Sequence, residues 1–185
     1  MIPVTQLRRG VVFEEDGQLW RVLDYDHYKP GRGNAIIRTK LRNLRSGATV
    51  ARTFLSGASV QDVRLDHQTV QFLYRDGDYF HFMDIETFEQ PMLPADVLAD
   101  VIPYLKEGIT LEIELYEGEP VGIEIPITVD LTVEDAPPGY AGDTATGATK
   151  QVTLETGMKL DVPLFINTGD VVRVDTRTGE YLTRV

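Results

Sequence analysis

Arg32 is the residue whose surroundings best suit contact with a charged partner. It lies in the segment 28–35, Tyr-Lys-Pro-Gly-Arg-Gly-Asn-Ala, between two runs rich in strand-forming residues. Pro30 fixes its own φ, and Gly31 and Gly33 accept left-handed backbone angles, so the chain is predicted to reverse here and project Arg32 outward. A guanidinium is always charged and offers a planar fork of donors, which suits phosphate. Basic hairpin tips are also common as merely solvated loops, so this segment alone leaves both interpretations open.

Further cations and aromatic residues flank this turn. Three cations alternate with other residues in the strand-like run that follows it: Arg38, Lys40 and Arg42. The period of two places them on one face of a strand. With Tyr25 and Tyr28 they form the mixture of basic and aromatic side chains that is typical of single-stranded RNA binding. We expect Trp20, in the same region, to lie in the core.

Charge is unevenly distributed along the 185 residues, although the net charge is -11. Residues 1–64 hold eleven Lys/Arg against six Asp/Glu, whereas residues 65–126 hold two against fourteen and residues 127–185 hold five against nine. A basic first third on an acidic chain predicts an oriented contact with phosphate, because the remainder is repelled.

Composition excludes several classes of chemistry. There is no Cys, which removes disulfides, thiolate metal sites and thiol catalysis, and the three His have no metal-ligand spacing, so no metal or cofactor is expected. The chain has no apolar run of membrane-spanning length and no signal-like start, so we expect no membrane contact and a cytoplasmic protein. The middle-third carboxylates leave open a carboxylate-based hydrolase, which would need two of them facing each other in a cleft.

Strand-like runs recur every eight to twelve residues and predict an all-β protein. Asp16-Gly17 and Asp76-Gly77 each mark a hairpin turn. One short helix is expected at 94–100, where Pro94 begins it and Pro103 stops it. The first third predicts a small barrel, and the later hairpins predict two further barrels.

The last third contains the most specific sequence motif of the chain, a set of residues at fixed spacing. The motif ends with the run 174–181, Val-Asp-Thr-Arg-Thr-Gly-Glu-Tyr. Its other members are Lys150, Gln151, Val152, Gly157, Leu160, Val162, Pro163, Ile166, Gly169 and Asp170. With these residues at this spacing, the chain resembles bacterial elongation factor P over essentially its whole length. The segment 29–33 matches the tip loop of that family, and residues 142–144 match its E-site loop.

The resemblance implies a KOW/SH3-like barrel at 1–64, an acidic OB-fold domain at 65–126 and a second OB-fold domain at 127–185, arranged as an L that mimics transfer RNA. It implies a non-enzymatic monomer that binds the 70S ribosome between the P and E sites and relieves stalling at consecutive prolines. The tip loop at the CCA end of P-site peptidyl-tRNA comprises Lys29, Pro30, Gly31, Arg32, Gly33 and Asn34. Gly142, Asp143 and Thr144 are then expected near E-site messenger RNA, and Tyr181 and Arg184 at the transfer-RNA elbow.

The tip departs from one common form of the family. Many members carry at this position a lysine that is lengthened by a β-lysyl group, whereas this chain has Arg32. Some arginine members are rhamnosylated, but their loop generally lacks this Pro-Gly-Arg-Gly arrangement. The modification of Arg32 therefore stays open, with a tip-modifying enzyme as a candidate partner and the bare arginine as a sufficient group.

Two other functions compete with the translation factor: a paralogue of that family, and a general single-stranded RNA-binding protein that uses its barrels as stacking platforms. The RNA-binding protein would bind free oligonucleotides in a salt-sensitive way.

Overall fold

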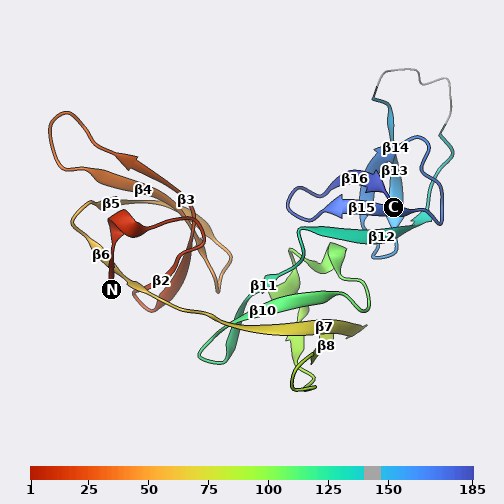
Figure 1. The fold of residues 1–185 in the computed structure, drawn as a ribbon, viewed down its shortest axis with the longest axis horizontal. Helices are drawn as coiled ribbons and strands as arrows, with labels where there is room; N and C mark the ends of the chain where they lie inside the picture. Colours follow the sequence, from red (N-terminus) through yellow and green to blue (C-terminus); the bar gives the residue numbers. More distant parts are fainter. Residues whose placement is uncertain (140–146) are drawn as a thin grey trace. The chain divides into compact units, whose positions relative to one another are not determined.

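The computed structural model describes residues 1–139 and 147–185, and within them the protein is built from strands with only short 3-10 helices (Figure 1). The strands form three sheets, which confirms the predicted all-β fold. None of the helices in these two ranges is long and apolar enough to cross a membrane.

The first sheet has six strands in the order β1-β6-β2-β3-β4-β5. The strands are β1 (Ile2–Pro3), β2 (Val12–Glu15), β3 (Gln18–Tyr28), β4 (Ile36–Asn43), β5 (Thr49–Leu55) and β6 (Ser59–Asp62), and η1 (Val4–Gln6) follows β1. Phe13, Val22 and Leu41 are buried together in its core, and the rings of Phe13 and Phe54 meet edge to face with centroids 6.2 Å apart. Asp16 and Gly17 both have positive φ, 52° and 74°, as the predicted two-residue hairpin turn requires.

The second sheet has five strands in the order β11-β10-β7-β8-β9. The strands are β7 (Asp66–Asp76), β8 (Tyr79–Asp84), β9 (Met92–Pro94), β10 (Thr110–Tyr116) and β11 (Glu119–Glu124). Phe72, Phe80 and Phe82 are buried on its inner face, with the Phe72 ring centroid 5.7 Å and 5.5 Å from the other two. A register shift between Phe72 and Tyr74 bends β7, which helps to curl this sheet into a half-barrel.

The expected helix at 94–100 is wrong. The segment instead forms two 3-10 turns, η2 (Ala95–Leu98) and η3 (Ile102–Tyr104), with Pro94 as the extended residue before the first. The N–H of Val101 donates to Leu98 O and the N–H of Tyr104 donates to Val101 O, both over three residues. Two prolines so close together leave too little chain for a stable α-helix, because Pro103 disfavours helical angles at the residue before it.

The third sheet also has five strands, in the order β14-β13-β12-β15-β16. The strands are β12 (Thr128–Asp135), β13 (Thr149–Leu154), β14 (Lys159–Pro163), β15 (Val171–Asp175) and β16 (Glu180–Arg184). Leu131, Val133, Leu154 and Val174 are buried in its core. Register shifts in the β12–β13 and β15–β16 pairs curl it into a second half-barrel.

The chain divides into two compact units. The first contains residues 1–67 and 114–122, and the second contains residues 68–113 and 123–185. Residues 114–122 thus group with the first unit, although β10 and β11 pair within the second sheet. Within that unit Glu114 Oε2 accepts a hydrogen bond from Arg21 at 2.5 Å, and Glu14 accepts one from the Tyr116 hydroxyl at 2.9 Å. The three-domain boundaries expected from the sequence stay a prediction.

Gly122 is expected to be needed for the partly buried Arg21–Glu114 pair. A Cβ on Gly122 would lie 2.6 Å from Glu114 Oε1, and Glu114 is only 7% exposed. Its carboxylate would have to move away from Arg21, so Gly122→Ala should lower the free energy of unfolding by about 1–3 kcal/mol. Urea denaturation followed by the fluorescence of Trp20, the single tryptophan, measures this change.

Gly57→Ala is the matched control for that substitution. A Cβ on Gly57 meets no atom within 4 Å, and its φ is not positive. Equal unfolding midpoints for the two variants would contradict the importance of the Arg21–Glu114 pair.

Candidate functional site

The loop that carries Arg32 lies at the end of the β3–β4 hairpin (Figure 1). The pairing of the two strands ends with Tyr28 opposite Ile36, and Ala35 O then accepts a hydrogen bond of 3.0 Å from the N–H of Ser56. Within the loop Pro30 is half-buried and the other side chains are exposed, namely Lys29, Arg32 and Asn34. The structure therefore places the predicted tip residues together on an exposed loop. This agrees with the alternation of basic and other residues that predicted a strand directly after the loop.

The chain reverses between Pro30 and Gly33. Gly33 has a φ of 110°, which side chains rarely adopt, and Pro30 Cγ lies 3.9 Å from the position of a Cβ on Gly33. Gly31 is not among the residues with positive φ, so the expectation of left-handed angles is confirmed for Gly33 and wrong for Gly31. Pro30 already begins the reversal through its fixed φ, and one left-handed residue after Arg32 completes it.

The hairpin below the loop is held by the barrel core. In β4 the residues Ile37, Thr39 and Leu41 are buried, and the Thr39 hydroxyl donates a hydrogen bond of 2.8 Å to Arg52 O in β5. Both neighbours of β4 pair with it along nearly its whole length. The tip loop therefore extends from a well-anchored hairpin.

The opposite face of β4 carries the predicted basic stripe. Its members, all exposed, are Arg38, Lys40 and Arg42. The register places Asp26 opposite Arg38 and Asp24 opposite Lys40, and directly opposed residues share a face of the sheet. Two of the three cations of the stripe thus have an acidic neighbour on β3. The alternation in Asp24-Tyr25-Asp26 was the signal for these acids, but only the strand register shows which cations they face.

Two exposed tyrosines of β3 lie beside arginines. Tyr25 is 37% exposed with Arg8 Cζ 5.1 Å from its ring centroid, and Tyr28 is 46% exposed with Arg38 Cζ at 4.8 Å. Such contacts hold the guanidinium over the ring face. The hairpin therefore combines aromatic and cationic side chains below the tip loop, as the sequence predicted.

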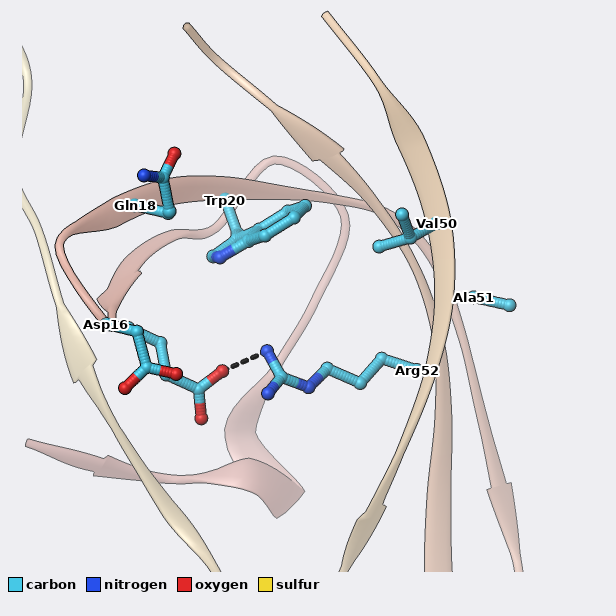
Figure 2. A pocket seen from close by; sticks show the side chains of 7 residues that line it. Asp16, Gln18, Trp20, Val50, Ala51 and Arg52 are labelled. Atoms are coloured by element: carbon cyan, nitrogen blue, oxygen red, sulfur yellow. Dashed lines mark ion pairs between the residues drawn. The ribbon is translucent and has the colours of Figure 1, made fainter. Parts of the chain in front are cut away.

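Trp20 lies apart from this aromatic group. It is partly buried, packs against the barrel core and lines a shallow hollow of about 370 Å³ between the β2–β3 turn and β5 (Figure 2). The remaining lining residues are Glu15, Asp16, Gln18, Val50, Ala51 and Arg52. Arg52 is ion-paired with Glu15 across the hollow, so this guanidinium is already engaged. The expectation that Trp20 lies in the core is confirmed in part, because Trp20 packs against the core but is not one of its buried members.

The pKa of Asp24, in β3, is lowered by its hydrogen bonds. Arg9 donates two hydrogen bonds to Asp24 Oδ1, at 3.0 Å and 3.3 Å, and the N–H of Tyr25 donates a third at 3.0 Å. Hydrogen bonds from Arg9 first, then from the Tyr25 backbone, lower the pKa of Asp24 from its ordinary value of 3.8.

We expect Arg9→Ala to raise the pKa of Asp24 toward its ordinary value, because Arg9 provides the largest part of the depression. A depressed folded-state pKa means that the carboxylate stabilises the fold fully above its unfolded pKa and loses that contribution as pH falls through the folded pKa. A carbon-13 NMR titration of the Asp24 carboxyl carbon measures the shift. Arg64→Ala removes another exposed cation and should leave the midpoint unchanged, and an unchanged midpoint in Arg9→Ala would contradict the assignment.

The other sequence-predicted site residues lie in the C-terminal third. Tyr181 in β16 is half-buried. Arg184 in the same strand is exposed, with its guanidinium 5.3 Å from the Phe165 ring centroid and 3.8 Å from Asp170 Oδ2. Gly142, Asp143 and Thr144 fall outside the described residues.

Three family models match successive parts of the chain. The elongation factor P KOW-like domain matches residues 3–60, the elongation factor P OB domain matches residues 65–123, and the C-terminal domain of elongation factor P matches residues 129–184. Nearly every residue is covered by one of the three.

The chain also matches solved structures that are named as translation initiation factors. Eukaryotic translation initiation factor 5A from Methanococcus jannaschii is 26% identical, with a TM-score of 0.51 over 68% of this chain and 90% of that chain. A translation initiation factor eIF-5A family protein from Naegleria fowleri ATCC 30863 is 12% identical, with a TM-score of 0.46 over 67% of this chain and 96% of that chain.

Proposed function

The chain belongs to the elongation factor P family of translation factors, which are not enzymes, and we propose that it relieves ribosomes stalled at consecutive prolines. In this proposal it binds the 70S ribosome between the P and E sites and positions the CCA end of P-site peptidyl-tRNA. The observation that carries the proposal is the exposed Arg32 on a sharply reversed loop at the end of a core-anchored hairpin. Family membership excludes the hydrolase alternative.

The chemistry of the Arg32 guanidinium supports a role in positioning the CCA end of peptidyl-tRNA. The ribosome already supplies the catalytic centre, so a factor accelerates the reaction by holding the acceptor end in a reactive geometry, which proline makes hard to reach. An arginine gives two parallel hydrogen bonds to a phosphate and thereby fixes orientation as well as distance. Pro30 fixes its own φ within the loop, so less loop entropy is lost when Arg32 binds.

The basic face of the hairpin supports contact with transfer RNA. Lys29 and Arg32 are exposed in the loop beyond the last pair of the strand register, whereas Arg38 and Lys40 face Asp26 and Asp24 within it. The exposed positive charge of the tip attracts a polyanion such as transfer RNA. We propose that the bare Arg32 guanidinium makes this contact, and an intact mass of the protein from its native host tests for a modification.

We propose the remaining contacts, with messenger RNA and the transfer-RNA elbow, from the family resemblance. Gly142, Asp143 and Thr144 are assigned to E-site messenger RNA, and Tyr181 and Arg184 to the transfer-RNA elbow. The exposed guanidinium of Arg184 over Phe165 is compatible with a phosphate contact. We propose that the protein acts in the cytoplasm as a monomer.

General binding of single-stranded RNA is the second candidate function. The exposed ring of Tyr28 beside Arg38 favours it, because successive bases stack on such platforms. This function predicts binding to free oligonucleotides with a logarithmic salt slope of about -0.7 per phosphate neutralised.

A reconstituted translation system that lacks elongation factor P tests the leading proposal. Addition of the purified protein should restore full-length product from a reporter that contains consecutive prolines, and it should leave a proline-free reporter unchanged. Ribosome binding without rescue would contradict the proposal. Salt-sensitive binding to free RNA, with neither rescue nor ribosome binding, would favour the second function instead.

A further inference from the structure

The outer face of the second sheet carries a group of aromatic and methionine side chains. In β8 the side chains of Phe80 and Phe82 are buried, whereas Tyr79, His81 and Met83 lie on the opposite face. Strand residues alternate between faces, so these three form one row along the strand.

The neighbouring strands extend this row sideways. His81 lies opposite Tyr74 of β7 and opposite Met92 of β9. The rings of Tyr74 and His81 are stacked, with centroids 4.4 Å apart and an interplanar angle of 13°. Tyr74 and Tyr79 are each 47% exposed and Met92 is 51% exposed. We call the five residues Tyr74, Tyr79, His81, Met83 and Met92 the outer aromatic face.

The charge around this face disfavours a polyanion. Residues 65–126 hold fourteen acids and only two cations, Arg75 and Lys106. Arg75 donates to Gly77 O at 2.8 Å and lies 4.9 Å from the Phe80 ring centroid, and Lys106 donates to Asp130 O at 2.6 Å. Two cations beside fourteen acids give few of the charge contacts on which the affinity of stacked RNA depends.

An acidic side chain, Asp76, lies next to the outer aromatic face. Asp76 is opposite Tyr79 in the register and is exposed. Aromatic rings next to a carboxylate attract a cation through the ring quadrupole and the negative charge together. The face is thus complementary to a cationic partner that also has a flat, weakly hydrated surface, and the guanidinium of arginine has both properties.

We propose that the outer aromatic face binds an arginine-rich segment of a partner protein. Guanidinium groups stack on the Tyr74–His81 pair, and the flexible side chains of Met83 and Met92 adapt to the methylene stems. Asp76 supplies the charge complement. This surface shares no residue with the tip loop that carries Arg32.

The four methionines allow a direct test on the full chain. They are Met1, Met83, Met92 and Met158, so protein labelled with carbon-13 at the methionine methyl groups gives two reporters on the face and two away from it. Titration with a short peptide of alternating arginine and glycine should shift the Met83 and Met92 resonances and leave Met1 and Met158 in place. A peptide of alternating aspartate and glycine should shift none of them.

Substitution of Tyr74 sharpens this test. Tyr74→Ala removes the exposed stacking ring and should weaken binding of the arginine peptide about tenfold. Phe165→Ala removes a 56% exposed aromatic elsewhere in the same unit and should leave the affinity unchanged. The spectra of the unbound variants show whether each remains folded.

Three results would overturn the proposal. One is the absence of any Met83 or Met92 shift with the arginine peptide. Another is an equal shift of all four methyl groups that Tyr74→Ala does not alter, which would indicate unspecific attraction by the acidic chain. The last is a shift of Met83 and Met92 with oligouridylate and not with the arginine peptide, which would assign the face to RNA.

Discussion

Arg32→Ala is expected to remove most of the rescue at consecutive prolines while the protein stays folded and bound to the ribosome. The side chain is exposed on the tip loop and makes no contribution to the barrel core, so its removal leaves the fold intact. Loss of one positioning group at a reacting centre costs on the order of tenfold to a hundredfold in rate. The measurement is the rate of full-length synthesis from the consecutive-proline reporter, beside a binding assay with the same ribosomes.

Two further variants separate the roles of charge and shape at the tip. Arg32→Lys keeps the charge but lacks the planar fork, so an intermediate rate is expected. Arg64→Ala removes another exposed cation of the basic first third and should rescue as well as the unchanged protein. Equal rescue by Arg32→Ala and Arg64→Ala would show that the tip guanidinium has no special role.

The position of Arg32 was predictable because the patterns around it are local. Alternation in 35–42 indicated a strand with one basic face, and the structure buries Ile37, Thr39 and Leu41 on the other face. Proline and glycine at fixed spacing indicated the reversal before Arg32 could be placed in space. Such patterns depend only on the pleat and on backbone sterics, so a single sequence contains them.

The features that the sequence did not predict depend on the register with which separate strands pair. Asp26 and Asp24 face Arg38 and Lys40 only because a register shift between Val22 and Asp24 sets the pairing of β3 with β4. Alternation alone gives no register, so the compensation of the basic stripe was not foreseen. For the same reason the row that joins Tyr74, His81 and Met92 across three strands was not recognised.

The helix expected at 94–100 was wrong for a different reason. Proline at the first position is a genuine signal for the start of a helix. It does not ensure that the helix is long enough to be stable. With Pro103 close behind, the chain closes turns over three residues instead, as the bond from Val101 N–H to Leu98 O shows. The conformation of a short segment depends on such competition between neighbouring residues. Average helix propensities do not represent this competition.

Phe13→Ala is expected to destabilise the first compact unit by about 3–5 kcal/mol, the usual range for loss of a buried phenylalanine. Phe13 is fully buried, and it lies opposite Trp20 in the register of β2 and β3. Trp20 is the single tryptophan, so its fluorescence during urea denaturation reports on this unit. The substitution should move that transition to clearly lower urea concentration.

Phe82→Ala is the matched variant, because Phe82 is equally buried but lies in the second unit. If the two units unfold separately, Phe82→Ala should leave the Trp20 transition nearly in place and lower only a second transition seen by circular dichroism. Equal displacement of the Trp20 transition by both variants would instead show a single cooperative transition. The first outcome would mean that the core supporting the Arg32 loop has a stability of its own, so that destabilising substitutions in the second unit leave this core folded.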